Sequence, residues 1–220
     1  AQPTITTTTS LTNNAEPVIE GEAEPGSTLT LFVDGETTGV TTIADGTTGA
    51  YTIAPTAGLS DGNHTVTVTA TDAAGNISTA SSELNLTVDT TAPAQPTITT
   101  TTILTSNSTS TIEGEAEAGS IVELFNGNVS LGTTTADAAG NFSITTTFSD
   151  DTYSLTVKAT DAAGNISESD ALTMTVDTTA PAQPTITTTT SLTNNAEPVI
   201  EGEAEPGSTL TLFVDGETTG

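Results

Sequence analysis

The chain has 220 residues, of which 28 are Asp or Glu and one is Lys or Arg, so its net charge at pH 7 is −27. This balance excludes a nucleic-acid-binding surface, which needs a basic footprint to displace the counterions of phosphates. One histidine and no cysteine also exclude repeated Ser-His-Asp, Cys-His or histidine-based zinc sites. We therefore expect neither an enzyme nor a nucleic-acid partner.

The composition favours strands. Thr makes up 55 of the 220 residues, and branched side chains such as Thr, Val and Ile favour extended backbone. Apolar residues alternate with these threonines, and no apolar run approaches the roughly 20 residues that cross a bilayer. We expect an all-β chain in which this segment does not span a membrane.

Internal repeats divide the chain into modules. The sequence AQPTIT begins at Ala1, Ala94 and Ala182, and residues 1–39 recur without a change at 182–220. Each whole repeat ends in VDTTAP, which carries a carboxylate and a stiffening proline and which we interpret as a linker. The expected units are residues 1–90, residues 91–178 and a partial third repeat at 179–220.

Within one repeat, apolar and polar residues alternate with the period of two that indicates a strand. In residues 64–71, Val66, Val68 and Ala70 share one face, and the intervening threonines take the other. Turn clusters such as EPGS, SDGN and DAAGN separate the alternating stretches. The first repeat is predicted to hold seven strands, near residues 3–9, 17–23, 28–34, 39–44, 49–55, 64–71 and 82–89.

Seven short strands in about 90 residues predict an immunoglobulin-like β-sandwich. The fold class expected for the chain is therefore all-β, with tandem immunoglobulin-like seven-stranded β-sandwiches. The partial third repeat is expected to contribute its first three strands.

His64 occupies the place in the first repeat that Tyr153 occupies in the second, directly after the acidic turns SDGN and SDDT. A tyrosine at this point is typical of a tyrosine corner, in which the hydroxyl hydrogen-bonds to the backbone a few residues upstream. We interpret Tyr153 as such a corner residue and His64 as its substitute.

The combination of TDAAGNIS, at Thr71–Ser78 and Thr160–Ser167, with the VDTTAP linkers resembles the bacterial immunoglobulin-like tandem repeats of giant biofilm-associated (Bap-like) surface adhesins. The resemblance covers the whole chain. It implies an extracellular stalk of a bacterial cell-surface protein that acts in cell adhesion and biofilm formation, exported by a type I system and stiffened by Ca²⁺ between domains. The partners it implies are the neighbouring repeats and like chains on other cells.

A calcium site also follows from the residues themselves. In a seven-stranded sandwich, the loops that follow strands two, four and six gather at the end where the chain enters. Here these loops and the incoming linker carry carboxylates, which repel one another unless a cation such as Ca²⁺, with its six to eight oxygen ligands, joins them. The candidate ligands are Asp89, Glu117, Asp137 and Asp161 at the first junction, Glu24, Asp45 and Asp72 at the entry of the first repeat, and Asp177 and Glu205 at the second junction.

Two alternatives stay open. The aspartates of D-x-x-G-N also form Asx turns, which close a hairpin without a metal. In a second class of function, the repeats themselves bind a host surface, a glycan or a like stalk, or assemble laterally into an extracellular filament, and identical copies supply avidity. A glycan site has little support, because the chain has no Trp and only two Tyr to stack on a sugar ring.

Overall fold

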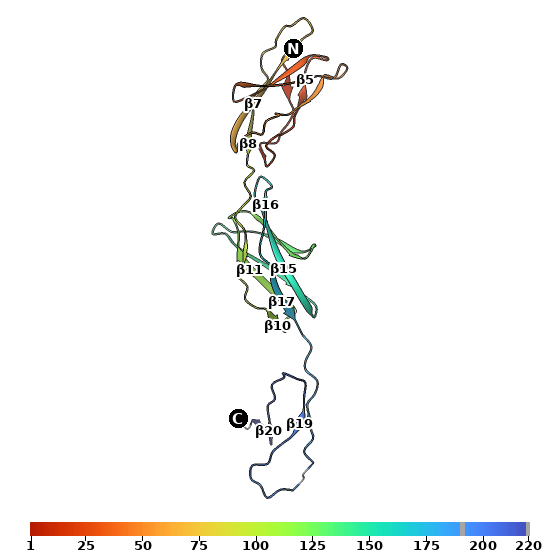
Figure 1. Cartoon of the computed structure of the whole chain (residues 1–220), viewed down its shortest axis with the longest axis vertical. Coiled ribbons are helices and arrows are strands. Elements are labelled where there is room, and N and C mark those ends of the chain that lie inside the picture. The colour runs from red at the N-terminus through yellow and green to blue at the C-terminus, as the bar shows by residue number, and fades with distance from the viewer. Residues whose placement is uncertain (190–191, 219–220) are drawn as a thin grey trace.

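The computed structural model describes residues 1–189 and 192–218, and its regular elements in these ranges are all strands. Figure 1 shows the units following one another along the long axis of the molecule. Within the described ranges, no helix has the length and apolar character needed to cross a membrane.

The first module is a sandwich of two sheets. One sheet has the strand order β1-β3-β6 and the other has the order β2-β8-β7-β4-β5, in which β2 runs parallel to β8. The strands are β1 (Thr4–Ile5), β2 (Leu11–Thr12), β3 (Ile19–Glu22), β4 (Thr28–Val33), β5 (Glu36–Ile43), β6 (Ala50–Ile53), β7 (Gly62–Thr71) and β8 (Leu84–Val88).

The predicted sandwich is confirmed, with one difference at its first strand. Of the strand expected near residues 3–9, only Thr4–Ile5 forms a strand, β1, which pairs with β3; β2, at Leu11–Thr12, is an additional eighth strand and pairs with β8. The chain thus leaves one sheet and joins the other, so that it covers an open edge of each.

The second module repeats this topology, with the orders β9-β11-β14 and β10-β17-β15-β12-β13, and with a short β16 on β15. Its strands are β9 (Thr97–Ile98), β10 (Leu104–Thr105), β11 (Thr109–Glu115), β12 (Ile121–Asn126), β13 (Val129–Thr135), β14 (Asn141–Thr147), β15 (Asp151–Thr160), β16 (Ile166–Glu168) and β17 (Leu172–Val176).

Each whole module has its own hydrophobic core, built from the alternation predicted for the strands. In β7, Val66, Val68 and Ala70 are buried, while the threonines between them are half-buried on the outer face. The equivalent side chains of β15, Leu155, Val157 and Ala159, are fully buried. The two cores are separate clusters, as expected for modules that fold as independent units.

The partial third repeat has paired strands but no closed core among its described residues. It contains β18 (Thr185–Ile186), β19 (Gly202–Glu203), β20 (Phe213–Val214) and β21 (Glu217–Thr218), and β18 pairs with β19 and β20 with β21. Ile200 and Leu210 are 45% and 62% exposed, whereas Ile19 and Leu29, their equivalents in the first module, are 1% and 0% exposed. The side chains that cover Ile19 and Leu29 come from strands beyond residue 39, to which the third repeat has no counterpart within 182–218.

A glycine lies opposite an aromatic ring at the same place in both modules. Gly21 of β3 pairs with Tyr51 of β6, and Gly114 of β11 pairs with Phe142 of β14. A methyl group on Gly21 would overlap the Thr4 carbonyl oxygen and the Tyr51 ring. The Tyr51 hydroxyl donates a hydrogen bond to that carbonyl oxygen at 2.8 Å, and burial raises the pKa of Tyr51 to about 12. Glycine therefore makes the room in which the ring reaches β1.

Replacing Gly21 with alanine (Gly21→Ala) is expected to destabilise the first module by about 2 kcal/mol, as overpacking of a filled core does. Gly114→Ala should do the same to the second module. Gly46→Ala is the matched control, because a methyl group at this turn position meets nothing within 4 Å. Thermal unfolding measures the effect, and an unchanged transition in Gly21→Ala would contradict this account of the β3–β6 contact.

Candidate functional site at the junction between modules

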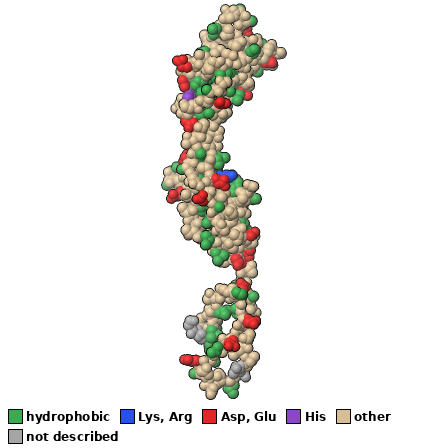
Figure 2. Space-filling model, in the orientation of Figure 1, with side chains coloured by type: hydrophobic (Ala, Val, Ile, Leu, Met, Phe, Trp, Pro, Cys, Tyr) green, Lys and Arg blue, Asp and Glu red, His purple; other side chains and the backbone are tan. Residues whose placement is uncertain are grey.

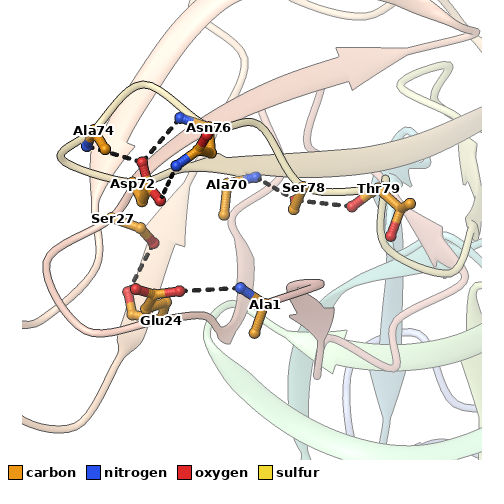
Figure 3. A network of polar contacts seen from close by, with 9 residues as sticks. All are labelled: Ala1, Glu24, Ser27, Ala70, Asp72, Ala74, Asn76, Ser78 and Thr79. Carbon is orange, nitrogen blue, oxygen red and sulfur yellow. Dashed lines mark hydrogen bonds and ion pairs between the residues drawn. The ribbon is translucent and has the colours of Figure 1, made fainter.

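The loops at the entry end of the first module lie together, as the sequence predicts. The Ala23 amide donates to the Gly49 carbonyl at 2.9 Å, which ties the β3–β4 turn to the β5–β6 loop. The N-terminal ammonium of Ala1 lies 3.0 Å from Glu24 Oε2 in the same region (Figure 3). The loops therefore bring their acidic residues to one end of the module.

The aspartates in these loops nevertheless bind their own turns. Asp72 Oδ1 accepts hydrogen bonds from the Ala74 and Asn76 amides at 2.9 Å, and Asp72 Oδ2 accepts one from the Asn76 side chain at 2.8 Å (Figure 3). The Asn76 side chain, followed by its backbone amide, holds the pKa of Asp72 below its ordinary value. Asp45 Oδ1 accepts the Thr48 and Thr47 amides at 2.7 and 2.9 Å. These are the Asx turns that the sequence left open as the alternative to metal binding.

The second module shows the same turns. Asp137 Oδ1 accepts the Ala139 and Asn141 amides, both at 2.8 Å, and the Asn141 amide is the largest cause that lowers the pKa of Asp137. Asp161 Oδ1 accepts the Gly164 amide at 2.7 Å and the Asn165 amide at 2.9 Å. In both turns the carboxylate is bound by amides of its own loop.

The predicted convergence of carboxylates on one ion is not seen. Within residues 1–189 and 192–218, no three acidic or histidine side chains lie close enough together to hold one metal ion. The physical reason is local, because the aspartate of each D-x-x-G-N turn accepts hydrogen bonds from the amides of its own turn. Since Ca²⁺ takes six to eight oxygen ligands, the side chains as they are arranged do not fit it. Calcium binding at the junction stays a prediction.

The remaining candidate ligands also have local partners. The Glu117 carbonyl accepts the Ser120 amide at 3.0 Å within the β11–β12 turn. At the second junction, Asp177 Oδ1 accepts the Thr179 amide and Glu205 Oε2 accepts the Ala182 amide, both at 3.1 Å. Each of these contacts positions a turn or a linker.

Asn165 connects the second module to the linker that enters it. Its side-chain amide donates to Asp161 Oδ2 and to the backbone carbonyl of Asp89, both at 2.8 Å. The Ser167 hydroxyl donates to the Ala94 carbonyl at 3.1 Å. Burial by itself would raise the pKa of Asp161, but the hydrogen bonds from Asn165 and Gly164 outweigh it and hold the pKa below its ordinary value. Asp89 and Asp161 are thus linked through the Asn165 side-chain amide and the Asp89 backbone carbonyl, and not by the convergence of their carboxylates that the sequence predicted.

The upstream half of the linker is held by a carboxylate that the sequence analysis did not single out. Asp61, in the turn before β7, accepts the Thr90 amide at 2.9 Å and the Thr90 hydroxyl at 2.8 Å through Oδ1. Its Oδ2 accepts the Thr91 hydroxyl at 2.8 Å. The Asp89 amide donates to the Thr12 carbonyl at 2.9 Å, which extends the β2–β8 pairing into the linker. The linker therefore leaves the first module in one orientation.

The second module holds its own linker in the same way. Asp150 Oδ1 accepts the Thr178 amide at 2.9 Å and the Thr178 hydroxyl at 2.6 Å, and Asp150 Oδ2 accepts the Thr179 hydroxyl at 2.8 Å. We refer to Asp61 with Thr90 and Thr91, and to Asp150 with Thr178 and Thr179, as the linker clamps. Their sequence signal is an acidic turn, SD, paired with a later DTT, and the two parts lie 29 residues apart in the first module.

The first junction is also closed by packing. Pro93 of the linker is buried, whereas Pro181, its equivalent in the second linker, is exposed. Gly164 lies against Asn13 of the first module, since a methyl group on Gly164 would be 3.4 Å from Asn13 Nδ2. The backbone φ of Gly164 is +96°, a value that favours glycine. The junction therefore joins the β2–β3 loop, the linker and the turn that follows β15.

Comparison with known proteins agrees with this architecture. The profile of the bacterial Ig-like domain family matches residues 4–90 and 95–178, which are the two whole modules. The chain belongs to the bacterial Ig-like domain family. No curated protein matches it.

Solved structures show what these bacterial Ig-like modules are similar to in fold. The fibronectin(III)-like modules of CbhA from Clostridium thermocellum superpose with a TM-score of 0.55 at 14% identity, over 79% of this chain and 93% of that chain. The BSP domain of a biofilm associated protein gives a TM-score of 0.31 at 21% identity, and the match spans 82% of this chain and 30% of that chain. The first comparison supports the tandem β-sandwich fold.

Acid is expected to release both linker clamps. The Thr90 amide, followed by the Thr91 and Thr90 hydroxyls, binds the charged carboxylate and holds the pKa of Asp61 below its ordinary value of 3.8. For Asp150, the Thr178 hydroxyl and amide have the same effect on the pKa. The clamps are therefore complete above pH 3.8 and are lost as the pH falls through the lower folded pKa.

NMR titration measures this release through the Thr90 and Thr178 amide protons and the carboxyl carbons of the two aspartates. The amide and carboxyl signals should move together, with a midpoint below 3.8. A midpoint at or above pH 3.8, or amide signals that do not change as the carboxyl groups titrate, would show that the clamps do not form in solution.

Proposed function

We propose that these bacterial Ig-like modules are extender repeats in the stalk of a large bacterial cell-surface adhesin, where they carry a distal part away from the cell in adhesion and biofilm formation. The observation that carries the proposal is the pair of linker clamps, in which each whole module holds its outgoing linker with one carboxylate and two threonines. A spacer depends on reproducible steps between modules, and an anchored linker supplies them.

The first junction is anchored from both sides. Asp61 holds Thr90 and Thr91 from the first module, while Asn165 and Ser167 hold the next part of the linker from the second. A short linker that is bound along its length and contains a buried proline has little of the freedom of a flexible chain. Two modules so joined extend in a defined direction.

The modules themselves suit a spacer. The longest strand of the first module, β7, has ten residues and spans about 33 Å at the rise of a β-strand. Acidic side chains are spread along the visible face of the molecule in Figure 2 and are not gathered over one element. Because each module carries negative charge, neighbouring stalks repel one another at low salt. Length and mutual repulsion are the properties expected of a surface extender.

Small-angle scattering of the 220-residue chain tests the extender proposal. Asp61→Ala combined with Asp150→Ala should shorten the maximum dimension and broaden the distance distribution, because both linkers lose their clamps, while circular dichroism shows unchanged strand content. Glu36→Ala with Glu83→Ala is the matched control, since it removes two exposed carboxylates outside the clamps. Equal dimensions for the two double variants would contradict the proposal.

We propose the calcium stiffening separately, because it requires the Asp161 carboxylate to exchange its turn hydrogen bonds for a metal. If Ca²⁺ contributes, a chelator should shorten the particle and lower its thermal midpoint, and Asp89→Ala with Asp161→Ala should abolish both responses. If the direct hydrogen bonds hold the junction alone, the chelator changes neither quantity, whereas Asn165→Ala increases bending. The second outcome would remove calcium from the proposal and leave the extender role intact.

A further inference from the structure

A histidine and an aspartate tie two loops together at the exit end of the first module. His64 Nδ1 lies 2.8 Å from Asp34 Oδ2 of the β4–β5 turn, and His64 Nε2 lies 2.8 Å from the Ser60 carbonyl oxygen. Asp34 Oδ1 also accepts the Thr65 amide at 2.9 Å. A carboxylate and a carbonyl oxygen can only accept hydrogen bonds, so both contacts are satisfied together when each ring nitrogen carries a proton. The geometry is that of an imidazolium.

The second module makes the equivalent contacts with neutral side chains. Tyr153 replaces His64, and its hydroxyl donates to the Ser149 carbonyl at 3.0 Å, four residues upstream as in the histidine contact. Asn126, which pairs with Leu155 as Val33 pairs with Val66, lies one position before the equivalent of Asp34, and its Oδ1 accepts the Ser154 amide at 3.3 Å as Asp34 accepts the Thr65 amide. The corner interaction predicted from the sequence is therefore confirmed in both modules: His64, which also meets the Asp34 carboxylate, makes it in the first, and the Tyr153 hydroxyl makes it in the second.

The histidine contact acts on the turn that holds the linker. Ser60 directly precedes Asp61, the carboxylate of the first clamp. The His64 side chain is 11% exposed, whereas the Asp34 side chain is 52% exposed. Asp34 faces the ring from the β4–β5 turn, Leu86 pairs with His64 from β8, and Asp61 lies in the Ser60 turn with its carboxylate on the linker threonines. The Ser60–Asp61 turn is thus held by His64 on one side and by the linker on the other.

We propose that His64 is a proton-controlled lock on the first linker clamp, and that the second clamp lacks this control. The inference rests on the linker-anchoring role proposed above. The protonated ring joins Asp34 to the turn that carries Asp61. A neutral imidazole has a single N–H, so loss of the proton breaks either the Asp34 or the Ser60 contact and loosens the turn. The second module has a tyrosine in place of this histidine, so its turn lacks the control.

The direction of the response follows from the two partners. The Ser60 carbonyl, followed by the Asp34 carboxylate, raises the pKa of His64 above its ordinary value of 6.5. A raised folded pKa means that the lock is fully closed below pH 6.5 and opens as the pH rises through the higher folded value. Alkaline conditions therefore loosen the first linker, whereas the second keeps its clamp.

NMR of the intact chain tests the lock, because the chain has one histidine and its ring signals are unambiguous. The ring should titrate above pH 6.5, and the hydrogen-exchange protection factor of the Thr90 amide should fall with the same midpoint. A loss of about fivefold is expected, the size of one lost hydrogen bond, while the Thr178 amide stays unchanged. A ring pKa at or below 6.5, or equal responses of Thr90 and Thr178, would overturn the proposal.

His64→Tyr with Asp34→Asn is the matched variant, because it gives the first module the corner tyrosine of the second and replaces the carboxylate with a neutral amide whose oxygen can still accept the Thr65 amide. It should fold and make Thr90 protection independent of pH over the range in which the wild-type chain responds; a persistent response would also overturn the lock. The test is separable from that of the extender role. If His64 does not control the clamp, the scattering result expected for Asp61→Ala with Asp150→Ala does not change. If that double variant keeps its particle length, the result expected for the His64 titration does not change.

Discussion

Twenty-eight carboxylates and a single cationic side chain leave almost every acidic group of this chain without an opposite charge to pair with. The donors that these carboxylates bind in this fold are backbone amides, threonine hydroxyls and asparagine side chains, and hydrogen bonds to a charged acceptor are stronger than those between neutral groups. Asp72, Asp137 and Asp161 bind amides of their own turns, while Asp61 and Asp150 bind the threonines of the linkers. The Thr-rich composition serves both needs, since its branched carbons favour strands and its hydroxyls bind carboxylates.

This constraint shapes the joints between modules. Both modules are acidic where they meet, so opposite charges cannot hold them together. The first junction instead uses neutral hydrogen-bond donors, a buried proline and the close approach of the Gly164 backbone to Asn13. Such a joint needs no oppositely charged group in the next module. The same linker sequence, VDTTAP, therefore follows both whole repeats. The second linker is held by its own module through Asp150, whatever follows it.

The two whole modules share a backbone and differ in the chemistry placed on it. Gly21 faces Tyr51 where Gly114 faces Phe142, and the corner residue is His64 in one module and Tyr153 in the other. Both corner residues bind the backbone carbonyl four residues upstream, but only His64 also meets a carboxylate. In the functions proposed here, the two repeats are equivalent as spacers and differ in their response to protons.

The sequence by itself determined the modules, their strands and the sides of those strands, because repetition and the two-residue alternation are local properties of the chain. The faces predicted for Val66, Val68 and Ala70 and the corner role of His64 and Tyr153 followed from this. Only the tertiary structure decided where the carboxylates point. The D-x-x-G-N turns are compatible with a metal or with their own amides, and the choice depends on how each turn closes. The clamps escaped prediction since Asp61 and Thr90 become neighbours only after β7 and β8 pair. The additional strand β2 likewise escaped prediction, because it forms only where β8 leaves an open sheet edge.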